Sequence, residues 1–276
     1  MKRIDDITLI GAGAVGLSIA LGLFSHGIGL SGIYSAGGVS AKKLGKKVRM
    51  NRCGKISELT TVGEVVILAV PDSQIRIVAD HLAQSVSSLQ GRVVVHLSGA
   101  LNSSELEVLR KKKAAVGSFH PMQTFPRSHP ASFAGVWCAA EGDAGALRVM
   151  KQLSKILGAN VFEISKKEKV LYHTAGVFAS NYLVVLMAAV NEIASGLRLP
   201  QSDIWKVYLP IMRQTLNNVV STTPRRALTG PIVRGDLVTV KNHLNALSKR
   251  PLQHLVQLYS ALGVEAARIA KENDAR

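Results

Sequence analysis

The chain has 276 residues, of which 47% are hydrophobic and 19% are charged, and this composition excludes an intrinsically disordered protein. The formal net charge of +16 invites a nucleic-acid function, but no helix-turn-helix, zinc-site or aromatic-platform pattern accompanies it, so we expect no nucleic-acid partner. Two cysteines and scattered histidines provide neither a disulfide framework nor metal-ligand spacing, which predicts no metal and a reducing, cytoplasmic location.

A glycine motif near the N-terminus is the most specific signal in the chain. The apolar segment Ile7–Ile10 predicts a strand, glycines follow at the dinucleotide-binding spacing, and an apolar helix begins directly behind them. The amides of the first helical turn and the positive end of the helix dipole would face a pyrophosphate. The alternatives are a glycine-rich turn that binds nothing and another Rossmann ligand such as S-adenosylmethionine. We expect the cofactor to contact Gly11, Gly13, Ala14, Val15 and Gly16.

The end of the second predicted strand indicates which dinucleotide binds. An Asp or Glu at this position accepts hydrogen bonds from both ribose hydroxyls and repels a 2′-phosphate. This chain has no acid there; Ser35 can hydrogen-bond a phosphate, and Lys42 and Lys43 follow closely. We therefore predict NADP as the cofactor, in preference to NAD. The alternative is that both lysines are solvated and that the pocket does not discriminate.

Alternating strand and helix patterns over residues 1–165 predict an α/β fold with a doubly wound parallel sheet, the Rossmann fold. The candidate strands are Ile7–Ile10, Leu30–Tyr34, Val65–Val70, Val93–Leu97, Ala114–Phe119, Val136–Ala139 and Asn160–Ile164. Residues 166–276 show helical patterns over Glu168–Arg198, Ser202–Val220, Asp236–Leu247 and Pro251–Lys271. We predict an NADP-binding Rossmann domain over 1–165, followed by an all-helical domain over 166–276 for substrate binding and dimerisation.

The longest apolar segment, Val177 to Val190, contains Asn181 and is too short to cross a bilayer. We expect it to form a buried helix, and we expect no membrane association. Its strongly apolar character suggests a homodimer through the helical domain, although the core helix of a monomer has the same pattern.

Several predicted strands end in polar segments that we expect to meet at one edge of the sheet, because ligands of parallel sheets lie beyond the carboxyl ends of the strands. Val70, Pro71 and Asp72 follow one of them, and we expect them to contact the nicotinamide half of the cofactor. Ser98 and His120 follow the next two strands. Ser98 is a candidate hydrogen-bond donor at the site, and His120 either takes part in the reaction or only braces the cleft.

The first long helix of the C-terminal part carries the remaining candidates. His173 and Ser180 are seven residues apart, so a step of about 100° per residue returns both to one face, and Asn181 lies on the same broad face. Histidine suits proton donation near neutral pH, so His173 is a candidate for a direct role in catalysis or substrate binding. Asn181 is a candidate for orienting a substrate carbonyl. The alternatives are a hydrogen-bonded core histidine and an asparagine that pairs with a buried backbone group.

Motifs along nearly the whole chain fall in the order of a known family. They are Gly11–Gly16, Leu68–Asp72, His96–Gly99, Ser118–Gln123, Tyr172–Gly176 with Ser180 and Asn181, and Leu228–Asp236. In this order they resemble a family of bacterial oxidoreductases of unassigned substrate, in which a Rossmann-like domain precedes a helical domain of unassigned function. That family is similar in fold to 6-phosphogluconate dehydrogenase, pyrroline-5-carboxylate reductase and the deazaflavin-dependent NADP reductases. The resemblance implies NADP binding, a C-terminal domain that helps to form a dimer, and an active site in the cleft between the domains.

One position departs from the wider fold family. Its hydroxyacid dehydrogenases place a catalytic lysine one turn before an asparagine, whereas here Lys169 precedes His173 by one turn. The proton donor is therefore open between Lys169, His173 and His120. We predict an NADP-dependent oxidoreductase that transfers a hydride between the nicotinamide and a small-molecule substrate, namely a polar carbonyl, imine or hydroxy compound. The alternative is a non-enzymatic NADP(H)-binding sensor or interaction protein.

Overall fold

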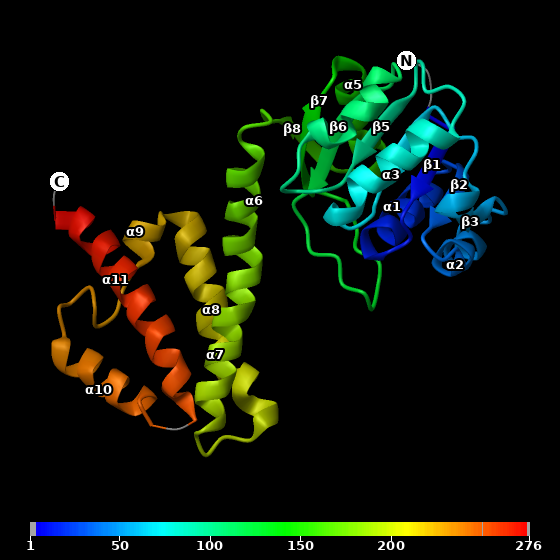
Figure 1. The fold of residues 1–276 in the computed structure, drawn as a ribbon. Helices are drawn as coiled ribbons and strands as arrows, with labels where there is room; N and C mark the ends of the chain where they lie inside the picture. Colours follow the sequence, from blue (N-terminus) through cyan, green and yellow to red (C-terminus); the bar gives the residue numbers. More distant parts are fainter. Residues whose placement is uncertain (1–3, 250, 275–276) are drawn as a thin grey trace. The chain divides into compact units, whose positions relative to one another are not determined.

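The computed structural model describes residues 4–249 and 251–274 and is drawn in Figure 1. The chain groups into two compact units, one up to Ser180 and one from Asn181 onward. The first holds a sheet with its helices, coloured blue to green in Figure 1, and the second is built from helices, coloured yellow-green to red. The predicted boundary between residues 165 and 166 lies before helix α6 (Lys169–Val177), which groups with the first unit.

An eight-stranded sheet runs through the first unit in the order β3-β2-β1-β4-β5-β6-β7-β8. All neighbouring pairs are parallel except β6 and β7, so β7 and β8 run against the other six strands. The predicted α/β class is confirmed, with these two reversed strands as the difference. Antiparallel pairing needs no crossover helix, and the loop 122–136 joins β6 to β7 without one. The strands are β1 (Ile7–Ile10), β2 (Leu30–Ser35), β3 (Cys53–Lys55), β4 (Val65–Leu68), β5 (Val93–His96), β6 (Ala115–Pro121), β7 (Trp137–Gly142) and β8 (Asn160–Glu163).

Helices cover both faces of this sheet and enclose two separate cores. One core packs α1, α2 and α5 on one face through residues such as Ile19, Leu44 and Met150, and the other packs α3 and α4 through Ile75 and Leu109. Successive strand residues alternate between the two cores, which is why the strands read as continuous apolar runs. The helices are α1 (Ala14–Ser25), α2 (Val39–Lys47), α3 (Asp72–Ser85), α4 (Glu107–Lys111) and α5 (Ala144–Leu157), with 3-10 turns η1 (Ile56–Glu58) and η2 (Ser103–Leu106).

The short edge strand β3 is absent from the predicted strands. It contains three residues at the end of the basic segment that begins at Lys42, and it pairs in parallel with β2. A strand of this length and composition carries no alternating apolar pattern, because its pairing depends on the neighbouring strand and not on its own side chains.

The second unit is helical, as predicted for the end of the chain. Its helices are α7 (Leu183–Ser195), α8 (Ile204–Ser221), α9 (Pro224–Ala227), α10 (Leu237–Leu247) and α11 (Leu255–Asp274), with 3-10 turns η4 (Gln201–Asp203) and η5 (Leu252–His254). Asp236 is the N-cap of α10, where its carboxylate accepts the Thr239 N–H at 3.0 Å and the Thr239 hydroxyl at 2.6 Å. Such a cap satisfies amides that the first turn leaves without partners.

A wide turn interrupts the helix predicted over Glu168–Arg198. Helix α6 is followed by a π-helical segment, η3 (Phe178–Tyr182), and then by α7. A π turn closes over five residues, so the step of about 100° per residue does not hold across it. The predicted common face of His173, Ser180 and Asn181 therefore does not follow from helical geometry.

The same segment also contradicts the prediction of a short, buried helix. Because η3 continues the helix, Lys169–Ser195 forms one helical segment of 27 residues. An 18-residue stretch within it has a mean hydropathy of 1.6, and 6% of that stretch is buried. Length and composition alone would allow such a helix to cross a membrane. Lys169, its first residue, is however 1% exposed and hydrogen-bonded within the first unit.

Candidate functional site

The glycine motif forms a turn between β1 and α1. One side of this turn packs against protein backbone, and the other side has free space. Gly11 has a φ of +106°, and a Cβ atom there would overlap the carbonyl of Ala69, just beyond β4. A Cβ on Gly16 would overlap the carbonyl of Gly11, so this glycine lets α1 begin directly against the turn. At Gly13, apart from the adjoining residues of the chain, no atom of the described residues lies within 4 Å of the Cβ position. The open side leaves room for a ligand to approach the backbone.

The first turn of α1 leaves backbone amides for an anion. Gly13 is the N-cap and contributes no side chain to them, and the first turn contains no acidic residue. The N–H groups at Ala14 and Val15 and the positive end of the helix dipole are thus arranged as a phosphate site requires. These residues fit the pyrophosphate of a dinucleotide.

Ser35 and the lysines of α2 lie at the predicted adenosine end. Ser35 is the last residue of β2, and its hydroxyl accepts the Ala41 N–H at 3.2 Å, which holds the start of α2 against the strand. As an acceptor in this bond, the hydroxyl keeps its hydrogen for donation. Lys42 and Lys43 are exposed on α2, and residues 36–47 contain no acidic side chain. The arrangement suits a 2′-phosphate and offers no carboxylate to repel it.

Asp72 and Ser98 connect the loops that follow β4 and β5. The Ser98 hydroxyl donates to the Asp72 carboxylate at 2.8 Å and accepts the Leu101 N–H at 2.9 Å. Val70 is half-buried, whereas Pro71, the N-cap of α3, and Asp72, its first residue, are exposed. The two loops are therefore held together at the edge of the sheet where the nicotinamide half of the cofactor is predicted to bind.

Two histidines enclose Gly99 at this edge. His120 lies on β6 and His173 on α6, with ring centroids 5.9 Å apart and planes inclined by 79°. A Cβ on Gly99 would lie 2.8 Å from Nε2 of His120 and would overlap Cδ2 of His173, so only glycine lets both imidazoles approach the loop. Tyr172 packs edge-on against His120 with ring centroids 5.5 Å apart. The two histidines singled out from the sequence therefore form one cluster with Gly99 and Tyr172.

Lys169, the first residue of α6, is buried beside this cluster. Its ammonium donates to the backbone oxygen of Ser98 at 2.7 Å and to the Ser118 hydroxyl at 2.6 Å. Burial lowers the pKa of the ammonium to about 8, although the carboxylates of Glu141 and Asp72 act in the opposite direction. The lysine thus attaches α6 to β6 and to the loop after β5.

The imidazoles of His96 and His120, which lie nearby, are neutral at pH 7. Burial lowers the pKa of His120 to about 4, and the positive charges of Lys169 and His173 act in the same direction. Burial likewise lowers the pKa of His96, at the end of β5, to about 4, and its Nε2 lies 3.1 Å from the carbonyl oxygen of Asn102. A group with such a pKa is not an imidazolium at pH 7, so His120 acts there as a neutral hydrogen-bonding group.

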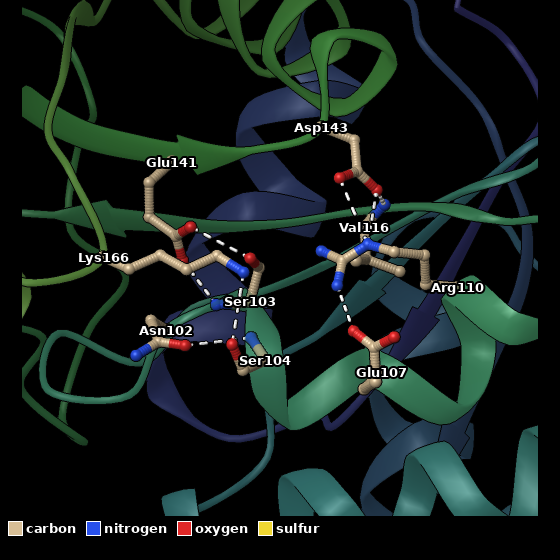
Figure 2. Close-up of polar contacts among 9 residues, drawn as sticks. All are labelled: Asn102, Ser103, Ser104, Glu107, Arg110, Val116, Glu141, Asp143 and Lys166. Carbon is tan, nitrogen blue, oxygen red and sulfur yellow. Dashed lines mark hydrogen bonds and ion pairs between the residues drawn. The ribbon is translucent and has the colours of Figure 1, made fainter.

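A polar network on β7 and α4 holds the surrounding loops in place, as Figure 2 shows. The buried Glu141 accepts two hydrogen bonds from Ser103, one from the backbone N–H and one from the hydroxyl at 2.9 Å. Asp143 accepts the Val116 N–H at 2.9 Å and pairs with Arg110 at 3.1 Å. Both carboxylates therefore hold the loop after β5 and the start of β6.

The structure brings Ser98, His120 and His173 together, with Lys169 adjacent, whereas Asn181 begins the second unit. The catalytic roles of these residues stay predictions, and so do the cofactor contacts. Tyr172 is a member of the cluster that the sequence reasoning missed. Positions 169, 172, 173 and 176 follow the i, i+3, i+4, i+7 spacing of one helix face, and this pattern was the signal that could have found it.

Comparisons with known proteins agree with this architecture. A Rossmann-like family model matches residues 2–121, and the model of DUF2520, a domain of unknown function, matches residues 136–266. No protein of curated function matches the sequence. BF3122 from Bacteroides fragilis, provisionally assigned as an NADP oxidoreductase, is 25% identical over 96% of this chain and 100% of its own, with a TM-score of 0.81.

Two further solved structures extend the comparison. Protein TM1727 from Thermotoga maritima is 27% identical over 98% of this chain and 100% of its own, with a TM-score of 0.72. A reductive aminase from Aspergillus terreus, solved with NADPH and ethyl-5-oxohexanoate, is 14% identical over 98% of this chain and 95% of its own, with a TM-score of 0.74. At that identity the aminase shows the shared fold alone. The chain therefore combines a Rossmann-like domain with a DUF2520 domain, in the domain order of the family that its sequence resembles.

Proposed function

We propose that the protein is an NADP-dependent oxidoreductase that transfers a hydride between the nicotinamide and a small polar carbonyl, imine or hydroxy compound. The observation that carries this proposal is the cluster of Gly99, His120 and His173, which lies at the edge of the sheet that also carries the open glycine turn. In Rossmann folds a dinucleotide lies across the carboxyl edge of the sheet, so the reacting half of the cofactor and these titratable side chains would share one region.

NADP is the cofactor that the adenosine end favours. The Ser35 hydroxyl and the exposed Lys42 and Lys43 offer hydrogen bonds and positive charge to a 2′-phosphate. The relatives support the same choice, since BF3122 carries the provisional assignment of an NADP oxidoreductase and the reductive aminase was solved with NADPH.

The residues of the cluster divide the remaining chemistry between them. Bound NADPH would supply the hydride, and the chain must orient the substrate and deliver a proton to the oxygen or nitrogen that gains charge. His173 is the candidate proton donor, because it is half-buried at Gly99 and its imidazole can carry a transferable proton on a ring nitrogen. Lys169 is a positioning residue in this scheme, since its ammonium is bonded to Ser98 and Ser118.

The first test is a titration with NADPH and with NADH, followed by nicotinamide fluorescence. The double variant Lys42→Ala/Lys43→Ala should weaken NADPH binding by about tenfold or more, since a charge-assisted hydrogen bond contributes roughly 1.5–3 kcal/mol. NADH binding should change little. The matched control is Lys46→Ala/Lys47→Ala, which removes the same charge from the last turn of the same helix. Equal losses in both double variants would contradict a specific phosphate site, and failure to bind either cofactor would exclude the oxidoreductase.

Turnover separates the enzyme from the alternative of a cofactor sensor. Purified protein is incubated with NADPH and matched panels of small carbonyl and imine compounds, and with NADP⁺ and the corresponding alcohols and amines. His173→Ala should lose most of the activity while its NADPH affinity stays unchanged. Normal turnover in that variant would remove His173 from the mechanism. Tight cofactor binding with no turnover across the panels would favour the sensor.

We also propose that the second unit pairs with a second copy of the chain. Helices α7 and α8 border an apolar groove of about 400 Å³, and nearby apolar side chains are exposed, including Val184 at 63% and Ile211 at 66%. An apolar face of this kind in a globular protein is typical of an interface. Light scattering should give the mass of a dimer, and Val184→Glu should give a monomer that keeps its helical content. A monomeric wild-type protein would contradict the proposal.

A further inference from the structure

Tyr172 makes two hydrogen bonds to a single residue of the site. Its hydroxyl oxygen lies 3.0 Å from Nδ1 of His120 and 3.3 Å from the backbone oxygen of the same histidine. Burial raises the pKa of the phenol to about 12, so it keeps its hydrogen at pH 7. The phenol has one hydrogen, so it can donate to only one of these two atoms of His120.

The backbone oxygen decides the answer, because a carbonyl can only accept a hydrogen bond. The phenol must therefore donate to the His120 carbonyl, and its lone pair is left to accept a hydrogen bond from Nδ1–H. A neutral imidazole carries one hydrogen, so a hydrogen on Nδ1 leaves a lone pair on Nε2. We propose that Tyr172 holds His120 in the Nδ1–H tautomer, so that Nε2 accepts a hydrogen bond from the N–H of a protonated imine or of the corresponding amine.

The surroundings of Nε2 agree with an acceptor that awaits a ligand. This atom faces Gly99, where a Cβ would lie 2.8 Å away, and within the residues that the structure describes no group hydrogen-bonds to it. A ketone oxygen carries no hydrogen, so it cannot donate a hydrogen bond to the lone pair of Nε2. An iminium N–H is a donor and can do so.

This inference names the substrate class of the proposed oxidoreductase and rests on that function, but its first test needs no cofactor. Long-range ¹H–¹⁵N NMR of the intact protein reports which imidazole nitrogen carries the hydrogen, and a His120→Gln variant identifies the signals of this residue. We expect the Nδ1–H pattern in the wild-type protein. In Tyr172→Phe the ratio of Nδ1–H to Nε2–H should fall about fivefold, the equivalent of ~1 kcal/mol for one hydrogen bond.

Two matched probes test the ligand class. Pyrrolidine hydrochloride carries an N–H donor, and tetrahydrofuran has a ring of the same size with an acceptor only. We expect the amine to shift the His120 Nε2 resonance and the ether to leave it unchanged. Tyr172→Phe should reduce this response to the amine.

The outcomes are distinct. An Nε2–H pattern in the wild-type protein would overturn the tautomer assignment, whether or not the variant folds. Equal responses to both probes, or to neither, would overturn the substrate class. The Nδ1–H pattern in a protein that binds no NADPH would uphold the role of Tyr172 and refute the oxidoreductase, so the two failures are distinguishable.

Discussion

Replacement of Lys169 by methionine should change how the stability of the first unit depends on pH. The buried ammonium has a pKa of about 8, against an ordinary value of 10.5. Between these two pH values the unfolded chain holds more protons than the folded one, so the free energy of unfolding must rise as the pH increases. One pKa unit corresponds to ~1.4 kcal/mol, so the rise should amount to about 3 kcal/mol across this window. Lys169→Met should lack it.

Urea unfolding at a series of pH values between 7 and 10.5 measures this rise. In a Trp205→Phe background, Trp137 on β7 is the remaining tryptophan and reports on the first unit. Lys167→Met serves as the control, because Lys167 is exposed and lies two residues before Lys169. Other groups that titrate in this range contribute equally to all variants and cancel in the differences. Parallel pH curves for the wild-type protein and Lys169→Met would refute the reasoning.

The glycines provide the remaining predictions. Gly11→Ala should destabilise the first unit strongly, since its Cβ would overlap a backbone carbonyl at a φ of +106°, whereas Gly13→Ala should change the free energy of unfolding by about 0.5 kcal/mol or less. Gly13→Ala should nevertheless weaken NADPH binding by about tenfold, because the added methyl group would occupy the side of the turn that is open to a ligand. Unchanged affinity in a calorimetric titration would contradict a pyrophosphate site at this glycine turn. Gly99→Ala should displace the imidazoles of His120 and His173, because the added Cβ would overlap side-chain atoms of both. Turnover should fall, and full activity would show that the cluster is not the site.

The sheet was predictable from the sequence because its strands are buried on both faces. Such strands form apolar runs that glycines and polar residues interrupt, and the predicted Ile7–Ile10 agrees with β1 at both ends. The reversal of β7 was not predictable in the same way. A strand pattern contains no direction, and the direction depends on whether a helix or a loop connects it to its neighbour.

The polar contacts of the site were harder to predict from the sequence than the strands. Lys169 reaches partners that are 71 and 51 residues away, so its burial depends on how β5, β6 and α6 pack and not on any local pattern. The role inferred for Tyr172 depends on the position of one backbone oxygen. The π turn η3 lies between His173 and Asn181, so the regular helical step does not fix how their side chains are oriented to one another, and their common face stays a prediction.

The reversed strands also change where functional variation should be sought among relatives. The six parallel strands have their carboxyl ends at the edge of the sheet that carries His120. The strands β7 and β8 run the other way, so their first residues lie at that edge. Met122 just after β6 donates its N–H to the backbone oxygen of Trp137, the first residue of β7. From there a row of aromatic rings runs through Phe162 on β8 to Tyr172, with centroids 6.1 and 5.8 Å apart. Differences in substrate preference between relatives should therefore be sought at the starts of these two strands, which a search guided by strand ends would pass over.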